Sequence, residues 1–217
     1  NLTEPQAGTD LGAIRTMATP NGDGTWSIKG QKIFITWGDH DVAENIVHLV
    51  LARTPDAPEG SKGISLFVAP KFLPDASGNP GERNAITTVS VEHKLGIHGS
   101  PTCVLEYEGA TGFLVGELHG GLAGMFVMMN SARVGMGLQA TGISDRAYQR
   151  ARAYAEERMQ GAVLDRPDGT PIAEHPDVRR LLLSMASEIA AMRALGVYVG
   201  DLFDRATDAD GIRLAEL

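Results

Sequence analysis

The chain has 217 residues, 43% of them hydrophobic, and its 27 acidic against 19 basic side chains give a formal net charge of −8. Nucleic acids and anionic membranes are normally bound by a basic patch, and no Lys/Arg block occurs, so we expect neither partner. The single cysteine, Cys103, excludes an intrachain disulfide and a cysteine-based metal cluster and suits a reducing compartment, so we expect a cytoplasmic protein.

Neither end of the chain has the features of a natural terminus. The sequence opens at Asn1-Leu2-Thr3, with no initiator Met and no basic-then-apolar signal segment. It stops at residues 212–217, inside a helical pattern and without a stop signal. No uninterrupted apolar run approaches the roughly 20 residues that cross a bilayer. We therefore expect an internal piece of a longer protein, without a membrane span.

The first half alternates short β-type runs with turn signals. Residues 26–28 and 32–36 flank residues 29–31 (Lys-Gly-Gln), which predicts a tight hairpin. Residues 45–52 form a more continuous apolar run, which predicts a strand buried on both faces. Further strands are predicted at residues 63–68, 86–91 and 103–107, and surface loops at 54–62 and 73–83. Five to seven strands over about 115 residues predict a compact antiparallel barrel or sandwich.

The second half changes to helical spacing. Apolar residues and one arginine recur every three or four positions and predict one or two long helices from Gly121 to about Met159: Leu122, Met125, Phe126, Met129, Arg133, Met136 and Ala140. Residues 165–176 form a loop with three prolines. Asp177, after Pro176, is a start signal for a second long helix. The apolar stripe of that helix is Val178, Leu181, Leu182, Met185, Ile189, Met192 and Val199.

Residues 135–140 (GMGLQA) fit the G-x-G-x-x-A form of a dinucleotide-binding fingerprint. That motif needs a strand before it and a helix that starts inside it, so that free backbone N–H groups meet the pyrophosphate. Here it lies in the middle of a predicted helix, so we interpret its small residues as packing residues. His93, His98 and His119 lack a compact metal-ligand spacing, and no metal site is expected.

Three segments combine polar side chains, aromatic rings and glycines. Residues 2–10 (LTEPQAGTD) form a Pro/Gly-bent loop that can present hydroxyls and N–H groups to an anionic ligand, or is an ordinary turn. Phe34 and Thr36 share one face of a strand, where a ring can stack on a planar cofactor beside a hydroxyl, or where the ring belongs to the core. Residues 94–102 (KLGIHGSPT) are a Gly-rich stretch with hydroxyls, or simply another loop.

Taken in this order, the segments resemble the acyl-CoA dehydrogenase family over essentially the whole chain. The matching motifs are the T-E-P-x-A-G-[ST]-D loop, the G-x-K-x-[WF]-I-T strand, the K-x-G-x-x-x-S-x-T segment, helix 117–133 and the run YAEER at 154–158. Each motif alone is moderately specific, and five in register are strong. Residues 34–41 and 128–130 (MMN) are similar to a larger bacterial branch with broad-range or methylthiopropanoyl-CoA-type substrates.

The resemblance implies a multidomain α+β fold. Residues 1–116 would be an antiparallel β middle domain that binds flavin and acyl-CoA. Residues 117–217 would be the first part of a C-terminal helical domain, an incomplete four-helix bundle. A helical first domain and a Gly-rich segment that holds the partner FAD pyrophosphate would lie outside this chain.

The cofactor implied by the resemblance is FAD. The residues that would bind it are Leu2, Thr3, Phe34, Thr36, Arg158 and Gln160. Thr3, with the backbone of Leu2, would bond the flavin pyrimidine edge. Phe34, in place of the commoner Trp, would pack on the isoalloxazine, and Thr36 would lie beside N5. Arg158, with Gln160 nearby, resembles an arm that reaches the FAD of a neighbouring subunit, which implies a homodimer or homotetramer.

The implied substrate is an acyl-CoA thioester. Thr9 resembles a residue that touches the CoA portion, and Asn130 and Arg133 match positions that line the acyl-CoA channel. Met125, Met128 and Met129 can adapt to several acyl shapes, or pack in an ordinary core.

The implied reaction is α,β-desaturation to the 2-enoyl-CoA, with electrons passed to electron-transfer flavoprotein. One family branch carries the catalytic glutamate just before the helix arginine, where this chain has Ala132. The commoner location lies beyond Leu217, so we expect no catalytic residue in this chain and no activity from it alone. An acyl-CoA oxidase, or a non-catalytic flavin-binding relative, are the alternatives.

Overall fold

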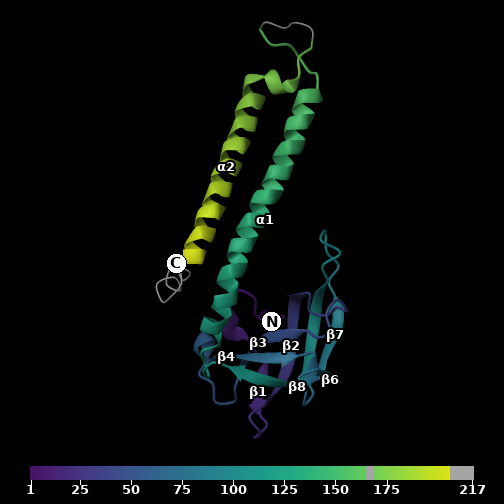
Figure 1. Ribbon diagram of the computed structural model, residues 1–217, viewed down its shortest axis with the longest axis vertical. Coiled ribbons are helices and arrows are strands. Elements are labelled where there is room, and N and C mark those ends of the chain that lie inside the picture. The colour runs from purple at the N-terminus through teal and green to yellow at the C-terminus, as the bar shows by residue number, and fades with distance from the viewer. Residues whose placement is uncertain (165–168, 206–217) are drawn as a thin grey trace. The chain divides into compact units, whose positions relative to one another are not determined.

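The computed structural model describes residues 1–164 and 169–205 (Figure 1). They divide into two compact units, the first of residues 1–127 and the second beginning at Met128. The strands of the first unit are β1 (Met17–Pro20), β2 (Trp26–Thr36), β3 (Val47–Arg53), β4 (Ile64–Pro70), β5 (Phe72–Pro74), β6 (Pro80–Arg83), β7 (Ile86–Val91) and β8 (Thr102–Val115). Two 3-10 turns, Leu11–Ala13 and Gly60–Gly63, lie between them. The predicted boundary at residue 116 falls between β8 and the first helix.

The first unit is a β-barrel. Six strands follow the order β2-β1-β3-β4-β8-β7, and an additional pairing of β2 with β8 closes the sheet on itself. Neighbours pair antiparallel, except that β1 and β3 are parallel at Met17 and Arg53. β5 and β6 form a separate two-stranded sheet. The predicted α+β class, with a β-barrel followed by long helices, is confirmed.

The barrel core is built from the inward positions of these strands. Tyr107, Phe67 and Ile28 are its largest members and are each 0% exposed, and Trp26 packs on Phe67 with ring centroids 5.3 Å apart. Alternation along β8 is less strict than in a half-exposed strand, since residues 102–105 are all buried; this part of β8 pairs with both β2 and β7. The strand predicted to be buried on both faces is confirmed in the second half of β3, whose residues 50–52 are fully buried.

The hairpin predicted at residues 29–31 is wrong. β2 is one continuous strand of 11 residues, and β8 pairs along most of its length. Gly30 is needed for close approach rather than for a turn: it has φ 148°, and an added Cβ would lie 2.6 Å from Thr16 Oγ1. A glycine flanked by β-type residues signals either role, and the sequence alone does not separate them.

The strand count also exceeds the prediction of five to seven. β1 is short and ends in Pro20, and the predicted loop at 73–83 contains most of the β5–β6 hairpin. The turn of that hairpin is organised by Asp75, whose Oδ1 accepts from the N–H groups of Ser77 (2.8 Å) and Asn79 (2.9 Å). All of β6 is exposed, so it lacks the apolar alternation by which strands are recognised.

Two long helices follow, α1 (Gly121–Glu157) and α2 (Pro176–Arg205), with a 3-10 turn (Ile172–Glu174) before the second. The predicted "one or two" helices before residue 159 are thus one. α2 begins at Pro176, one residue before the predicted start, because proline at the first helical position sacrifices no hydrogen bond. Of the loop predicted at 165–176, residues 165–168 lie outside the described residues.

Within the second unit α1 and α2 lie side by side (Figure 1). Arg193 forms a 3.2 Å ion pair with Asp145, and Leu138 packs against Gly196. Ile189, at the centre of the predicted stripe of α2, is 5% exposed.

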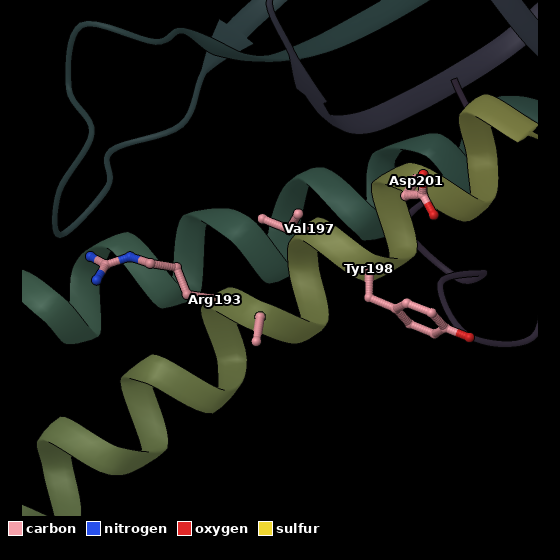
Figure 2. A pocket seen from close by; sticks show the side chains of 5 residues that line it. Arg193, Val197, Tyr198 and Asp201 are labelled. Atoms are coloured by element: carbon pink, nitrogen blue, oxygen red, sulfur yellow. The ribbon is translucent and has the colours of Figure 1, made fainter.

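Much of the remaining surface of α2 is apolar and exposed. A surface hollow of about 640 Å³ is lined by Arg193, Ala194, Val197, Tyr198 and Asp201. Figure 2 shows four of these side chains on α2, those of Arg193, Val197, Tyr198 and Asp201. α2 is also long and apolar enough to cross a membrane. This is weak evidence for a membrane span, because the core helices of soluble proteins meet the same criteria. The sequence pattern does not predict α2 as a membrane span, because Glu188 and Arg193 interrupt its apolar run.

Gly121, the first residue of α1, is packed against the backbone of β4. An added Cβ would lie 2.4 Å from the carbonyl carbon of Ser65, and the N–H of His119 donates to Ser65 Oγ at 2.9 Å. We expect Gly121→Ala to lower the stability of β4 by about 1–3 kcal/mol, because the helix start must move outward. Amide exchange of residues 64–70 in the full-length protein measures this. Gly99→Ala, where an added Cβ meets nothing within 4 Å, is the matched control and should leave exchange unchanged.

Candidate functional site

The loop at residues 1–10 is fixed against β2. The N–H of Ile33 donates to the carbonyl of Thr3 at 2.9 Å, and Lys32 Nζ donates to the carbonyl of Leu2 at 3.1 Å. The bend itself is closed by reciprocal backbone hydrogen bonds of 2.9 and 3.0 Å between Glu4 and Ala7. Leu2 and Thr3 are half-buried. The predicted flavin-binding loop therefore lies beside β2, the strand that carries two further predicted flavin contacts, Phe34 and Thr36.

Glu4 anchors this loop from inside, a role that the sequence analysis missed. Its Oε1 accepts from Lys32 Nζ (2.8 Å), Thr16 Oγ1 (2.6 Å) and the N–H of Thr16 (3.1 Å). Its Oε2 accepts from the N–H of Arg15 (2.6 Å) and from Gln6 Nε2 (2.7 Å). The side chains of Glu4 and Lys32 are 3% and 0% exposed. The carboxylate is thus buried but well satisfied.

The charge state of Glu4 follows from these partners. Burial alone raises the pKa of this carboxyl, but the Lys32 charge and the hydrogen bonds from Lys32, Thr16 and Arg15 outweigh burial and lower the pKa to about 2. Lys32 therefore stays paired with a carboxylate at neutral pH.

A bulge in β2 separates Lys32 from Phe34. Strict alternation would place Lys32, Phe34 and Thr36 on one face, yet Lys32 is 0% exposed and Phe34 is 60% exposed. The register with β8 shifts between Lys32 and Ile35, and Phe34 has φ 58°. β-bulges re-aim side chains near functional sites, and positive φ in a large residue costs free energy. The predicted exposure of Phe34 and Thr36 toward a ligand is consistent with this geometry.

Phe34 is held in a conformation that glycine adopts without strain. We expect Phe34→Gly to raise the stability of β2 in the apoprotein by about 0.5–1 kcal/mol. The variant loses the strain of the left-handed backbone, and this gain exceeds the extra conformational entropy that glycine gives the unfolded chain. Amide exchange of residues 26–36 reports the change. Phe113→Gly, an exposed phenylalanine on β8 that lacks positive φ, should instead lower stability. A loss in both variants contradicts the strain argument.

The third unusual segment, residues 94–102, is also attached to β2. The N–H of Trp37, which follows the strand, donates to the carbonyl of Pro101 at 2.7 Å, and Lys94 Nζ donates to the carbonyl of Ser100. Thr9 is exposed, and the next residue, Asp10, caps the first 3-10 turn by accepting from the N–H of Gly12 at 3.0 Å. All three segments singled out by the sequence are therefore linked through β2 or lie in its bound loop.

The predicted substrate residues on α1 form a pair. Arg133 donates to Asn130 Oδ1 at 3.2 Å; Asn130 is half-buried and Arg133 exposed. Ala132 lies exposed between them. Met125 is 1% exposed and belongs to the core of the first unit, which agrees with the core-packing alternative, whereas Met128 is 41% exposed.

Arg158 and Gln160 are also brought together. Arg158 Nη2 donates to Gln160 Oε1 at 3.1 Å, and both side chains are exposed. Their backbones are held by the returning chain: the N–H of Ile172 donates to the carbonyl of Arg158 (2.8 Å), and the N–H of Gln160 donates to the carbonyl of Thr170 (3.0 Å). The pair thus lies on a turn that backbone hydrogen bonds hold, and its role toward a neighbouring subunit stays a prediction.

The G-x-G-x-x-A sequence lies inside α1, which confirms the predicted position in the middle of a helix. Among the described residues an added Cβ at Gly135 or Gly137 meets nothing within 4 Å, so the interpretation of these glycines as close-packing residues is not supported there. The described part of the chain holds no group of three or more His, Cys, Asp or Glu side chains that could bind a metal ion.

Comparison with known proteins decides the family. The family model for "Acyl-CoA dehydrogenase, middle domain" matches residues 1–110, and that for "Acyl-CoA dehydrogenase, C-terminal domain" matches residues 119–215. The chain belongs to the acyl-CoA dehydrogenase family. The resemblance inferred from the five motifs is thereby confirmed.

Relatives agree with this assignment. A 3-methylmercaptopropionyl-CoA dehydrogenase of Ruegeria pomeroyi is 55% identical over 95% of this chain, and a broad-specificity linear acyl-CoA dehydrogenase of Mycobacterium tuberculosis is 46% identical over 94%. This acyl-CoA dehydrogenase chain spans 35% of the length of each. The solved butyryl-CoA dehydrogenase of Megasphaera elsdenii is similar with TM-score 0.72 and 32% identity, covering 91% of this chain and 46% of that chain.

Proposed function

We propose that the full-length protein catalyses FAD-dependent α,β-dehydrogenation of an acyl-CoA thioester to the 2-enoyl-CoA. The observation that carries the proposal is the attachment of the loop with Thr3 to β2, directly beside exposed Phe34 and Thr36. Residues 1–116 would be the flavin- and acyl-CoA-binding middle domain, and residues 117–217 the first part of the helical domain.

The residues of the first unit fit a planar flavin. Phe34 exposes its ring, and the hydroxyls of Thr3 and Thr36 have no hydrogen-bond partner within residues 1–164 and 169–205. We propose that Thr3 and the Leu2 backbone hold the pyrimidine edge, that Phe34 packs on the ring system, and that Thr36 bonds beside N5. When bound, FAD would accept the β-hydrogen of the substrate as a hydride.

The proposed substrate is an acyl-CoA thioester. Thr9 is proposed to contact the CoA portion, and Asn130 and Arg133 to line the acyl channel. The names of the two relatives favour methylthiopropanoyl-type or linear acyl groups. The α-proton would pass to a glutamate supplied outside residues 1–217, because Ala132 cannot accept one. Residues 1–217 alone are therefore proposed to be inactive.

Assembly and partners are further parts of the proposal. Arg158 and Gln160 would reach the FAD of a neighbouring subunit in a homodimer or homotetramer. Electron-transfer flavoprotein is the proposed electron acceptor, and the cytoplasm the proposed compartment.

The test is an anaerobic titration of the full-length protein with acyl-CoAs of graded length, including 3-methylthiopropanoyl-CoA, followed by flavin absorbance. Bleaching by one or more thioesters is expected. If FAD is bound but no acyl-CoA bleaches its absorbance, the proposal is contradicted and a non-catalytic relative is favoured. Admission of air after bleaching separates the enzyme classes: slow reoxidation is expected, and rapid peroxide formation identifies an oxidase.

A further inference from the structure

We propose that the buried ion pair of Glu4 and Lys32 is a positioning device for the flavin. It would set the spacing between the loop that carries Leu2 and Thr3 and the part of β2 that carries Phe34 and Thr36. The inference rests on the proposed function and assigns roles to two residues that would not touch the cofactor.

The geometry links both halves of the site through one ammonium group. Lys32 Nζ bonds the carbonyl of Leu2 (3.1 Å) and the carboxylate of Glu4 (2.8 Å), so it holds the loop on either side of Thr3. Thr3 itself is bonded by the N–H of Ile33 at 2.9 Å. Phe34 follows directly, at the bulge. Residues 2–4 and 32–34 are therefore held in one fixed arrangement by consecutive contacts.

Burial makes this arrangement specific. Lys32 is 0% exposed and Glu4 is 3% exposed, so water cannot replace either partner. Buried ion pairs are often no more stabilising than apolar residues of the same volume, but they permit few alternative geometries. A site whose two halves must match a rigid ring requires such control, because small displacements of positioned groups weaken binding and slow the reaction.

The test uses the full-length protein and four variants. In Glu4→Gln/Lys32→Met, no buried charge is left unpaired, but residue 32 no longer donates to Leu2. Thr16→Val is milder: it removes only the 2.6 Å hydrogen bond to Glu4. Lys32→Met alone breaks the pair. Asn84→Ala is the matched structural control, because buried Asn84 donates to the carbonyls of Pro70 and Thr111, at 2.9 and 2.8 Å, away from the loop.

The readouts are FAD affinity of the apoprotein, the visible flavin spectrum and the separate changes in kcat and KM. We expect the double variant to bind FAD roughly tenfold more weakly, and its flavin absorption bands to shift. The fall in kcat should be larger than the change in KM. Thr16→Val should show a smaller change of the same sign. Asn84→Ala should lose thermal stability but keep the parent FAD affinity and spectrum.

Parent-like FAD affinity and spectrum in the double variant overturn the proposal and leave the pair a purely structural role. If the double variant does not fold, Thr16→Val decides in the same way: an unchanged spectrum and affinity overturn the proposal. Failure of the proposed function is distinct, because the parent itself would then lack FAD or resist bleaching by every acyl-CoA.

Discussion

Lys32→Met should lower the stability of the first unit by about 3–5 kcal/mol, since it leaves the buried carboxylate of Glu4 without its countercharge. The carboxylate keeps Thr16 and the N–H of Arg15 as donors, but these neutral groups do not replace a cation at 2.8 Å. The affected segment is β2, where Lys32 lies. Amide exchange of residues 26–36 in the full-length apoprotein, followed by mass spectrometry, measures the local free energy of opening.

Two control variants distinguish the cost of leaving a buried charge unpaired from the cost of losing an ion pair. Glu4→Gln/Lys32→Met removes both charges and should return within about 1 kcal/mol of the parent. Arg152→Met removes an exposed pair, with Arg152 and Glu156 60% and 54% exposed, and should leave the stability close to that of the parent. A loss below about 1 kcal/mol in Lys32→Met would mean that the pair is hydrated in solution, contrary to its burial.

Acid should destabilise the first unit through Glu4. Its folded pKa of about 2 lies below the ordinary value of 4.5, so the folded state holds the carboxylate charged where the unfolded chain binds a proton. The stabilisation is therefore complete above pH 4.5 and is lost as the pH falls from 4.5 through about 2. A shift of this size corresponds to about 3 kcal/mol.

Other carboxylates also titrate in this range, so the loss of stability with falling pH is compared between the parent and a variant that lacks the Glu4 carboxylate. Stability of β2 is followed by urea-dependent amide exchange from pH 6 to pH 2, in the parent and in Glu4→Gln/Lys32→Met. The parent should lose more stability than the double variant, by up to about 3 kcal/mol. Parallel pH profiles of the two proteins would show that Glu4 has an ordinary pKa and is not held as a buried carboxylate.

The fold was predictable where local pattern and tertiary role agree. Continuous apolar character identified β3, and helical spacing identified α1 and α2. The pattern failed where another element decides the outcome. Gly30 signals a turn, but the approach of Thr16 makes it part of a continuous strand. The exposed β6 carries no apolar pattern and exists through its pairing with β5.

The candidate site was predictable to the level of its segments. Polar and aromatic residues in the three unusual segments pointed to a ligand, and the structure links these segments through β2. The ion pair was not predictable, because Glu4 and Lys32 are 28 residues apart and each has the appearance of a solvated charge. The bulge after Lys32, which turns this side chain inward and Phe34 outward, is the feature that alternation does not reveal.

FAD affinity measures whether the loop at Thr3 and the bulged end of β2 together form a flavin site. Full-length apoprotein is titrated with FAD in three forms: parent, Phe34→Gly and Phe113→Gly. We expect Phe34→Gly to bind FAD about tenfold more weakly, through loss of ring stacking, although its apoprotein is the more stable one. Phe113→Gly should bind FAD like the parent. Equal affinity in the parent and Phe34→Gly would mean that Phe34 does not stack on the flavin and that the cofactor lies elsewhere.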